Sequence, residues 1–292
     1  MGVDVGAAVV TMADRAFLTR LRAGDGPSHR LLVLLDQHRV MTTGQLARVT
    51  DAPERTVRYR LERLREARLV DCVRPGRESG SAPRHWWLRP AGARMVAGTA
   101  AAEGKPAGMF VAHAAAITEV WLSLVEYGGS VGVTVESRLT DRAGWQGWDG
   151  TRPWSRRHRL TPDAVVRLAL AGGESPAVLI EVDLASMTQT LLRQKVERYL
   201  AYAAARAWGG VFAQCPPLLL LTKTATRAAT FVRTARSLLE QHERQYGGAD
   251  PADEPVVAAC GLVLEPARAV TEACWMLSDI AASEVTLREI WA

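Results

Sequence analysis

The sequence predicts a mixed α/β protein, of the α+β kind, with two domains, and three observations support this. Residues 30–97 contain two consecutive helix-start signals followed by a strand–loop–strand pattern. Residues 109–292 alternate between strand-like and helix-like apolar patterns. The chain of 292 residues exceeds one average domain of roughly 100–200 residues, and its 48% hydrophobic and 23% charged residues are ordinary for globular proteins. Disordered, collagen-like and disulfide-scaffold proteins are therefore excluded.

Charge is distributed unevenly along the chain. Residues 30–94 contain fourteen Arg against seven Asp or Glu, whereas residues 246–292 contain two Arg against eight acidic residues. A basic segment of this kind suggests an anionic partner. Arg also greatly outnumbers Lys, which is typical of GC-rich coding sequences, so arginine content alone does not identify nucleic-acid binding. The cysteines lack the close spacing of a zinc site or a redox pair and are expected to be buried free thiols: Cys72, Cys215, Cys260 and Cys274.

The segment boundaries follow from composition. We expect an N-terminal arm at 1–29, a first domain at 30–97, a Gly/Ala/Pro-rich linker at 98–108 and a second domain at 109–292. No uninterrupted apolar run approaches the roughly 20 residues of a membrane-spanning helix. The first residues also lack a basic segment before their apolar stretch. We therefore expect a cytoplasmic protein without a membrane partner.

The first domain is expected to contain three helices in succession. A short apolar helix lies around residues 31–35, and Thr42 and Gln45 have the spacing of a capping box that opens the second helix. Asp51 and Pro53 form the next helix start, with Asp51 as the cap, and this third helix extends to about residue 67. Its apolar residues form one core stripe: Val57, Leu61 and Leu64.

The opposite face of the third helix carries the residues expected to contact DNA: Arg55, Thr56, Tyr59, Arg60 and Arg63. Two strands, near 69–73 and 85–88, enclose a flexible loop flanked by arginines, and a closing helix covers 90–96. The expected DNA-contacting arginines of this loop are Arg74, Arg77 and Arg84. The order of elements resembles winged helix-turn-helix domains, which implies double-stranded DNA as the partner. The alternative is a winged helix that mediates only protein contacts.

The second domain is expected to follow the order α-β-β-β-α-β-α. The helices and strands that the pattern predicts are a helix at 113–127, strands at 131–136, 163–170 and 177–184, a helix at 188–208, a buried strand at 217–222 and a helix at 225–246. A further strand is expected within 256–264. The elements alternate in the manner of an α/β sheet covered by helices.

Three acidic residues stand out among the apolar strands. Asp163 begins one strand directly after a proline, and Glu181 and Asp183 lie two residues apart on the next, so their side chains share one face. Burying carboxylates beside apolar residues is costly unless a cation or a hydrogen-bond donor is present. Oxygen ligands of this kind suit Mg²⁺, which commonly uses one or two carboxylates together with phosphate oxygens and water.

This arrangement resembles the PD-(D/E)xK nuclease superfamily. The resemblance implies that Asp163 and Glu181 hold Mg²⁺ or Mn²⁺, with Glu119 on the preceding helix as an additional metal ligand. The family's lysine is expected at position 183, where this sequence has Asp183. Lys195 on the following helix is then the candidate replacement. The candidate catalytic residues are Asp163, Glu181, Asp183 and Lys195.

Each of these assignments has a structural alternative. The acidic residues can be solvated or paired with arginines, and Lys195 can pair with Glu197 or another nearby acid. The segment 141–160, rich in Trp and Arg, is expected either to bind substrate or to anchor a long loop on the core. The candidate substrate-loop residues are Trp154, Arg156 and Arg157.

Taken over the whole chain, the sequence is similar to the replication-relaxation family. The segments that carry the resemblance are 31–88, 161–166 and 179–199. The resemblance implies a DNA-binding protein of a plasmid or mobile element with a role in replication or DNA relaxation. Two functions follow: an enzyme that nicks or processes DNA at the acidic site, or a non-catalytic regulator or replication initiator. In the second case the nuclease-like domain serves for docking or for forming a homodimer.

Overall fold

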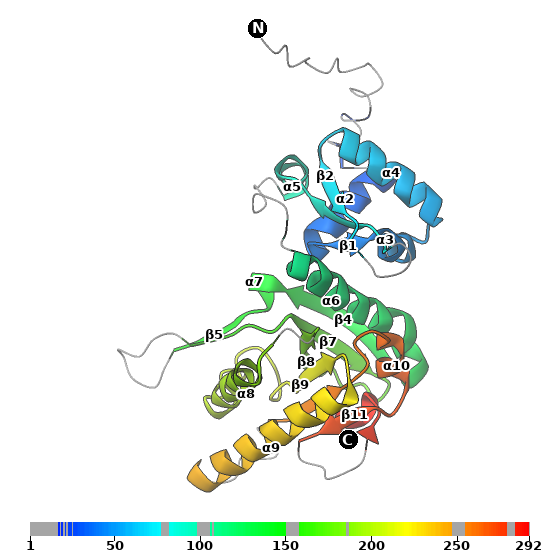
Figure 1. Ribbon diagram of the computed structural model, residues 1–292. Helices are drawn as coiled ribbons and strands as arrows, with labels where there is room; N and C mark the ends of the chain where they lie inside the picture. The colour runs from blue at the N-terminus through cyan, green and yellow to red at the C-terminus, as the bar shows by residue number, and fades with distance from the viewer. Residues whose placement is uncertain are drawn as a thin grey trace. The chain divides into compact units, whose positions relative to one another are not determined.

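The computed structural model describes residues 26–76, 82–97, 108–149, 158–184, 187–246, 255–278 and 284–291, together with residues 17, 19, 21, 23, 24 and 106. The protein is mixed α/β, as the sequence predicts, with one large sheet (Figure 1). It divides into two compact units, 1–118 and 119–292. The border falls inside helix α6, Gly108–Tyr127. Most of the expected linker at 98–108 lies outside the described residues.

The first unit combines helices with a small antiparallel sheet whose strand order is β1-β3-β2. Its core contains the three stripe residues expected from the sequence, together with Leu32 and Trp86, all of which are fully buried. The elements are α2 (Pro27–His38), β1 (Met41–Thr42), α3 (Thr43–Thr50), α4 (Glu54–Glu66), β2 (Val70–Val73), β3 (His85–Leu88) and α5 (Pro90–Ala97).

The connection between α3 and α4 confirms one of the two expected caps and corrects the other. Thr42 and Gln45 form the capping box, with the Gln45 amide donating to Thr42 Oγ1 at 3.1 Å and the Thr42 amide donating to Gln45 Oε1 at 2.9 Å. Asp51 instead ends α3, in the left-handed region at φ 48° and ψ 48°. Helix α4 begins after Pro53 without a side-chain cap. Since only three residues separate the helices, Asp51 closes the first helix and Pro53 starts the second.

The beginning of α6 belongs to the first unit. Gln45 Nε2 donates to the carbonyl oxygen of Ala115 at 2.9 Å. His38 Nδ1 lies 3.2 Å from Thr118 Oγ1, and Val111 packs with Trp87 in a small buried cluster. The sequence boundary at 108 assigned the whole helix to the second domain, whereas these contacts place its first half in the first unit.

The second unit is built on a seven-stranded sheet with the order β12-β11-β10-β9-β8-β7-β4. Strands β8, β9 and β10 are parallel, and the other neighbours are antiparallel. The strands are β4 (Val133–Thr140), β7 (Ala164–Leu170), β8 (Ala177–Asp183), β9 (Leu218–Thr222), β10 (Val257–Cys260), β11 (Trp275–Leu277) and β12 (Glu284–Val285). The parallel connections pass through α8 (Gln189–Ala204) and α9 (Ala225–Tyr246).

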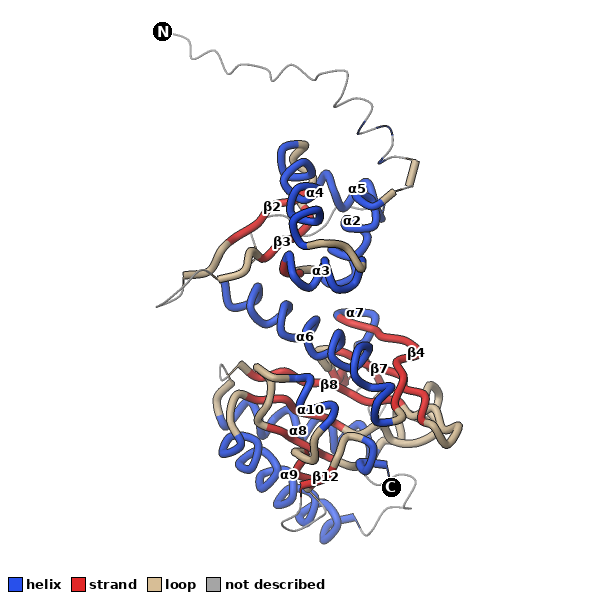
Figure 2. Tube along the Cα trace, turned by 90° about the vertical axis from the view of Figure 1, so that its right-hand side faces the viewer, coloured by secondary structure: helices blue, strands red, loops and turns tan. Residues whose placement is uncertain are grey.

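Helices cover both faces of this sheet (Figure 2). On one face, Val196 of α8 and Phe231 of α9 pack against strand residues such as Leu179 and Leu220. On the other face, the second half of α6 and helix α10 (Pro266–Thr271) cover apolar strand residues; the helix residues involved include Val120, Leu124 and Val270. Alternate residues of β8 therefore face different helices, and Glu181 and Asp183 share the face covered by α8 and α9.

Several short elements were not predicted from the sequence. Trp148 and His158 stack at 5.3 Å between ring centroids across a two-stranded hairpin, whose strands are too short to show alternation. The unpredicted elements are β1, η1 (Gly128–Val131), α7 (Asp141–Gly144), β5 (Gln146–Trp148), β6 (His158–Leu160), α10, β11, β12 and η3 (Arg288–Trp291). The expected substrate-loop residues, Trp154, Arg156 and Arg157, lie outside the described residues.

One helical stretch in the described part of the chain, Gly108–Val131, is long and apolar enough to cross a membrane by length and composition alone. The helix is not an uninterrupted apolar run, because it contains Glu119 and Glu126, and for this reason the sequence pattern did not indicate it. Within the fold 44% of its most apolar window is buried. A core helix passes the same test, so this finding is weak evidence for a membrane.

Candidate functional site

Asp163 and Glu181 lie opposite each other on neighbouring strands. Strands β7 and β8 are antiparallel, with Ala164 paired to Ile180, so the next residues outward are Asp163 and Glu181. Directly opposed residues in an antiparallel pair project to the same face. The backbone amide of Val182 donates to Asp163 Oδ2 at 2.8 Å, and the two carboxyl groups also hydrogen-bond to each other. The sequence expectation that these two acids lie close together agrees with this geometry.

The Glu181 carboxyl group is in an unfavourable position for a negative charge. It is only 2% exposed. Burial, and then the negative charge of Asp163, raise the pKa of Glu181 to about 8, and nearby Lys195 offsets part of this effect. Two neighbouring carboxyl groups in a buried place cannot both carry a negative charge unless a cation lies close to them. Without that cation, one of the two groups keeps its proton. The Glu181 carboxyl group therefore favours either a bound proton or a further cation beside it.

Lys195 reaches the same place from α8. Its Nζ atom donates to Glu181 Oε2. Thr188 caps the helix by accepting from the Leu191 amide at 3.3 Å, and this start sets which side of α8 faces the sheet. The alternative pairing with Glu197 is absent, because Arg193 Nε donates to Glu197 Oε1 at 2.8 Å. Lys195 keeps 26% of its side chain exposed, so the site opens to the surface beside it.

Asp183 forms a separate cluster. It is fully buried, and Arg227 Nε donates to its Oδ2 atom, while the Met187 amide donates to Oδ1 at 3.4 Å. Arg227 Nη2 also donates to the Met187 carbonyl oxygen, so the guanidinium fastens the chain between β8 and α8. The three acids expected at one place are thus divided between two clusters. Among the described residues, no three His, Cys, Asp or Glu side chains are grouped to hold a metal.

Sequence reasoning missed Arg227. It lies in the first turn of α9, five residues after the end of β9. Since β8 and β9 are parallel, with Asp183 paired to Thr222, their carboxyl ends meet at one edge of the sheet. A basic residue shortly after the end of the neighbouring strand was the available signal.

Glu119 does not join Asp163 and Glu181 in a group of three. The next residue of α6, Val120, packs with Ile180 on the sheet face opposite to the one that Glu181 shares with α8 and α9. The prediction of Glu119 as a third metal ligand is therefore not supported by its position.

The remaining pair nevertheless fits the donor chemistry of a divalent cation. Mg²⁺ commonly takes one or two carboxylates from a protein and completes its shell with phosphate oxygens and water. Asp163 and Glu181 offer two carboxyl groups at one place, and the pKa of Glu181 stays raised although Lys195 pairs with it. Asp163 is partly exposed, so a cation and a phosphate have access from the surface.

The expected DNA-contacting residues of α4 differ in their surroundings. Arg55 is exposed and Tyr59 is 65% exposed, whereas Thr56 and Arg60 are half-buried. The guanidinium of Arg63 lies 4.5 Å from the centroid of the Phe17 ring, so it contacts the N-terminal segment. The exposed residue next to Tyr59, Arg58, was not among the predicted contacts.

The arginines of the β2–β3 loop are also unequal. Arg84 forms an ion pair with Glu62 of α4, and its guanidinium lies 5.9 Å from the centroid of the Trp86 ring. Arg74 is exposed. Arg77 lies outside the described residues. Among the described residues of the first unit, the exposed members of the expected DNA-binding set and its neighbours therefore include Arg55, Arg58, Tyr59 and Arg74.

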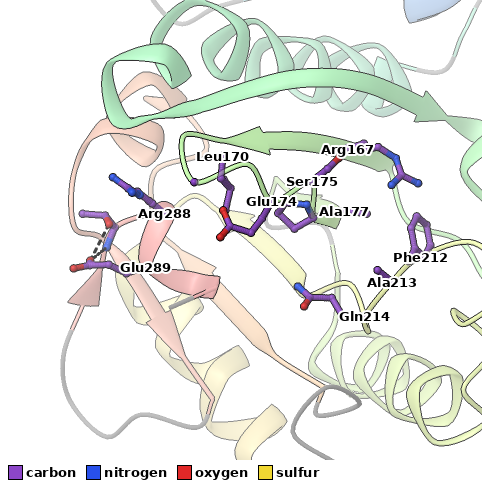
Figure 3. A pocket seen from close by; sticks show the side chains of 13 residues that line it. Arg167, Leu170, Glu174, Ser175, Ala177, Phe212, Ala213, Gln214, Arg288 and Glu289 are labelled. Carbon is purple, nitrogen blue, oxygen red and sulfur yellow. Dashed lines mark hydrogen bonds between the residues drawn. The ribbon is translucent and has the colours of Figure 1, made fainter.

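A cavity of about 770 Å³ lies elsewhere in the second unit (Figure 3). Its lining includes Arg167 and Leu170 near the end of β7, Ala177 at the start of β8, and Arg288. Asp163 and Glu181 are at the other ends of these strands, and none of the expected site residues lines the cavity. The carboxylate pair is therefore separate from this cavity.

These features define the class of protein: a two-unit α/β protein whose second unit holds two opposed carboxyl groups and a lysine. The replication-relaxation family model matches residues 32–214, which is more than half of the chain. The chain belongs to the replication-relaxation family. The matched span includes Asp163, Glu181 and Lys195 and ends before Arg227. No curated protein and no solved structure matches the chain. Family membership suggests an interaction with DNA and a role in the replication of plasmids or other mobile elements.

Proposed function

We propose that this protein binds double-stranded DNA with its first unit and nicks a DNA strand with Mg²⁺ or Mn²⁺ at Asp163 and Glu181. The observation that carries the proposal is the carboxylate pair with Lys195. Two acids lie opposite each other on adjacent strands, and a lysine from the following helix contacts Glu181. A buried carboxyl group whose pKa is raised by burial and by a neighbouring acid, as at Glu181, is typical of functional sites.

The DNA-binding part of the proposal is supported by the order of elements in the first unit. Helix, short strand, two helices and a two-stranded hairpin follow one another, as in winged helix-turn-helix domains. In such domains the second helix of the pair, here α4, enters the major groove. Arg55, Arg58 and Tyr59 project from this helix into solvent, where arginines suit phosphates and guanine edges.

The nuclease part is supported by the order of elements in the second unit. The run α6-β4-β7-β8-α8-β9 has the α-β-β-β-α-β order of PD-(D/E)xK enzymes. Asp163 stands directly before the second strand of this run and Glu181 is on the third. The cation expected at position 183 is supplied from two helices instead: Lys195 contacts Glu181, and Arg227 contacts Asp183.

The roles of the residues follow from their contacts. Asp163 and Glu181 would hold the metal ion, which when bound supplies Lewis-acid polarisation of a phosphate oxygen and lowers the pKa of water. The Val182 amide fixes the Asp163 carboxylate in position. Lys195 places a partly exposed ammonium group beside Glu181, where it can donate a hydrogen bond to water or to a phosphate oxygen. Arg227 holds the chain that leads into α8.

A second candidate function is non-catalytic DNA binding, as a regulator or replication initiator. The observation that favours it is that each of the two buried acids of β8 already contacts a cation, Lys195 or Arg227. Such ion pairs are also found in sites that serve only the fold. In this case the second unit would serve for docking or for dimerisation.

A plasmid-nicking experiment separates the two functions. Supercoiled plasmid is incubated with the wild type and with Asp163→Ala/Glu181→Ala in Mg²⁺ or Mn²⁺. A matched control is Arg193→Ala/Glu197→Ala, which removes an exposed ion pair on the same helix as Lys195. Open circles formed by the wild type and the control but not by the Asp163/Glu181 variant support the nuclease. Absence of nicking with retained, salt-sensitive duplex binding supports the second function.

A further inference from the structure

Two cysteines that are distant in sequence lie side by side in the second unit. Cys260 is the last residue of β10, and Cys274 directly precedes β11. Ala259 pairs with Met276 across these antiparallel strands, so Cys260 lies opposite Trp275 and next to Cys274. The two thiols hydrogen-bond to each other. Their spacing does not predict this pairing, because thirteen residues, including α10, separate the two cysteines.

The two thiols differ in accessibility and acidity. Cys260 is fully buried, whereas Cys274 is partly exposed. The hydrogen bond from Cys260 lowers the pKa of Cys274; Arg268 acts in the same direction, against burial and the acidic residues Glu272 and Glu284. The hydrogen bond and burial raise the pKa of the Cys260 thiol. Cys274 is therefore the more reactive member of the pair.

We propose that Cys260 and Cys274 form a redox-active pair that a peroxide oxidises reversibly to a disulfide. The Cys274 thiolate attacks the O–O bond of hydrogen peroxide, forms a sulfenic acid and releases hydroxide, which takes up a proton to become water. The Cys260 sulfur then attacks Cys274 Sγ, the S–S bond forms and the S–O bond breaks, and a second water leaves. Two thiols are oxidised and one peroxide is reduced to two waters.

The disulfide would close a short loop that contains α10. This helix covers the sheet face opposite Glu181, where Trp275 Nε1 donates to the Ala269 carbonyl oxygen at 2.7 Å. A cross-link across this loop restricts the unfolded chain and fastens α10 to the sheet. The inference does not depend on DNA binding or on the carboxylate pair.

The full chain offers a clear test, because Arg244, Arg268 and Arg288 place the two cysteines on different tryptic peptides, 245–268 and 269–288. The protein is treated with a small excess of hydrogen peroxide, the reaction is stopped with catalase, and the remaining thiols are alkylated before digestion without reductant. We expect one cross-linked peptide pair, lighter than the sum of the two peptides by two hydrogens, which dithiothreitol separates. The unfolding temperature should rise by about 5 °C on oxidation.

Three variants complete the test. Cys274→Ser should abolish the cross-link, and because this residue is partly exposed the variant is expected to fold; Cys260→Ser should leave Cys274 as a sulfenic acid that a dimedone probe traps. Cys72→Ser is the matched control and should form the cross-link like the wild type. The proposal is overturned if the cross-linked peptide is absent while Cys274 is over-oxidised to sulfinic acid, or if Cys72 or Cys215 reacts first.

Discussion

Glu181 and Asp183 lie two residues apart on β8 and face the same helices, yet the charges around them differ. Asp183 has one full cation, Arg227, and its hydrogen bonds are made within the fold. Glu181 lies beside the Asp163 carboxyl group as well as Lys195, and burial and the Asp163 charge raise its pKa to about 8. We call Asp183 a balanced acid, because a cation pairs with it, and such an acid stabilises the fold. We call Glu181 with Asp163 an unbalanced acid pair, because the pKa of Glu181 stays raised, and such a pair is suited to bind a further cation. The contrast separates a structural cluster from a candidate active site.

The largest effect is expected from breaking the balanced cluster. Arg227→Ala leaves the buried Asp183 carboxylate without its cation, and losing one partner of a buried ion pair typically costs about 3–5 kcal/mol. Urea unfolding followed by tryptophan fluorescence measures this loss. The control is Arg233→Ala, an exposed arginine on the same helix that donates to Thr230 Oγ1 at 3.1 Å, where a change within about 0.5 kcal/mol is expected. Equal losses in the two variants would contradict the structural role of Arg227.

The same contrast exists among the arginines of the first unit, and it predicts the next largest effect. Arg55 and Arg58 are exposed, whereas Arg63 is held against Phe17. Arg55→Ala/Arg58→Ala should weaken duplex binding about tenfold or more and lower the salt slope by about 2, since each lost phosphate contact removes about one unit. Gel shifts at several salt concentrations measure both quantities.

Arg63→Ala is the comparison for this pair. Its guanidinium–ring contact is worth about 0.5–1 kcal/mol of stability, and we expect its loss to appear in unfolding more than in DNA binding. Unchanged affinity in the Arg55/Arg58 variant would show that α4 is not the DNA-contacting helix.

A smaller effect is expected when the unbalanced acid is neutralised. Glu181→Gln keeps the shape and an oxygen acceptor for Lys195 and removes the repulsion with Asp163, so the free energy of unfolding should change by only about 1 kcal/mol or less. Asp183→Asn should cost clearly more, because Arg227 loses its counter-charge. Plasmid nicking should be lost in Glu181→Gln. Equal destabilisation by the two amide variants would identify Glu181 as a second structural ion pair and favour the non-catalytic function.

The part of the site that sequence predicts is the part set by local periodicity. Asp163 and Glu181 belong to strands joined by a short turn, so alternation along each strand places both acids on one face. Lys195 lies fourteen residues after Glu181, on the next helix, where it reaches back to the sheet. Arg227 is different, because it reaches Asp183 from a helix that follows another strand. Its position five residues after the end of β9 indicates the contact only once β8 and β9 are known to be parallel neighbours.

The fold shows the same limit. Long elements such as α8 and α9 appear in the sequence as sustained apolar patterns, and their positions agree with expectation. The last strands, β11 and β12, have three and two residues and provide too few positions for a pattern. β11 is a strand because it pairs with the edge of β10, and β12 in turn pairs with β11, so the backbone groups at each edge find partners. The contact between Cys260 and Cys274 depends on that pairing and was invisible for the same reason.

The smallest effect on stability is expected from His85, a buried side chain without an ion-pair role in this comparison. His85 on β3 is 9% exposed, and its Nδ1 atom lies 3.1 Å from the Pro83 carbonyl oxygen. Burial lowers the pKa of His85 from its ordinary value of 6.5, so the unfolded chain takes up the proton more readily than the folded protein. The stability from the neutral ring is therefore complete above pH 6.5 and falls as the pH drops below that value. His85→Phe should show less loss of unfolding free energy than the wild type between pH 7.5 and pH 5. If the unfolding free energies of the two proteins changed in parallel with pH, His85 would take up its proton equally well in the folded and unfolded states, and this prediction would be wrong.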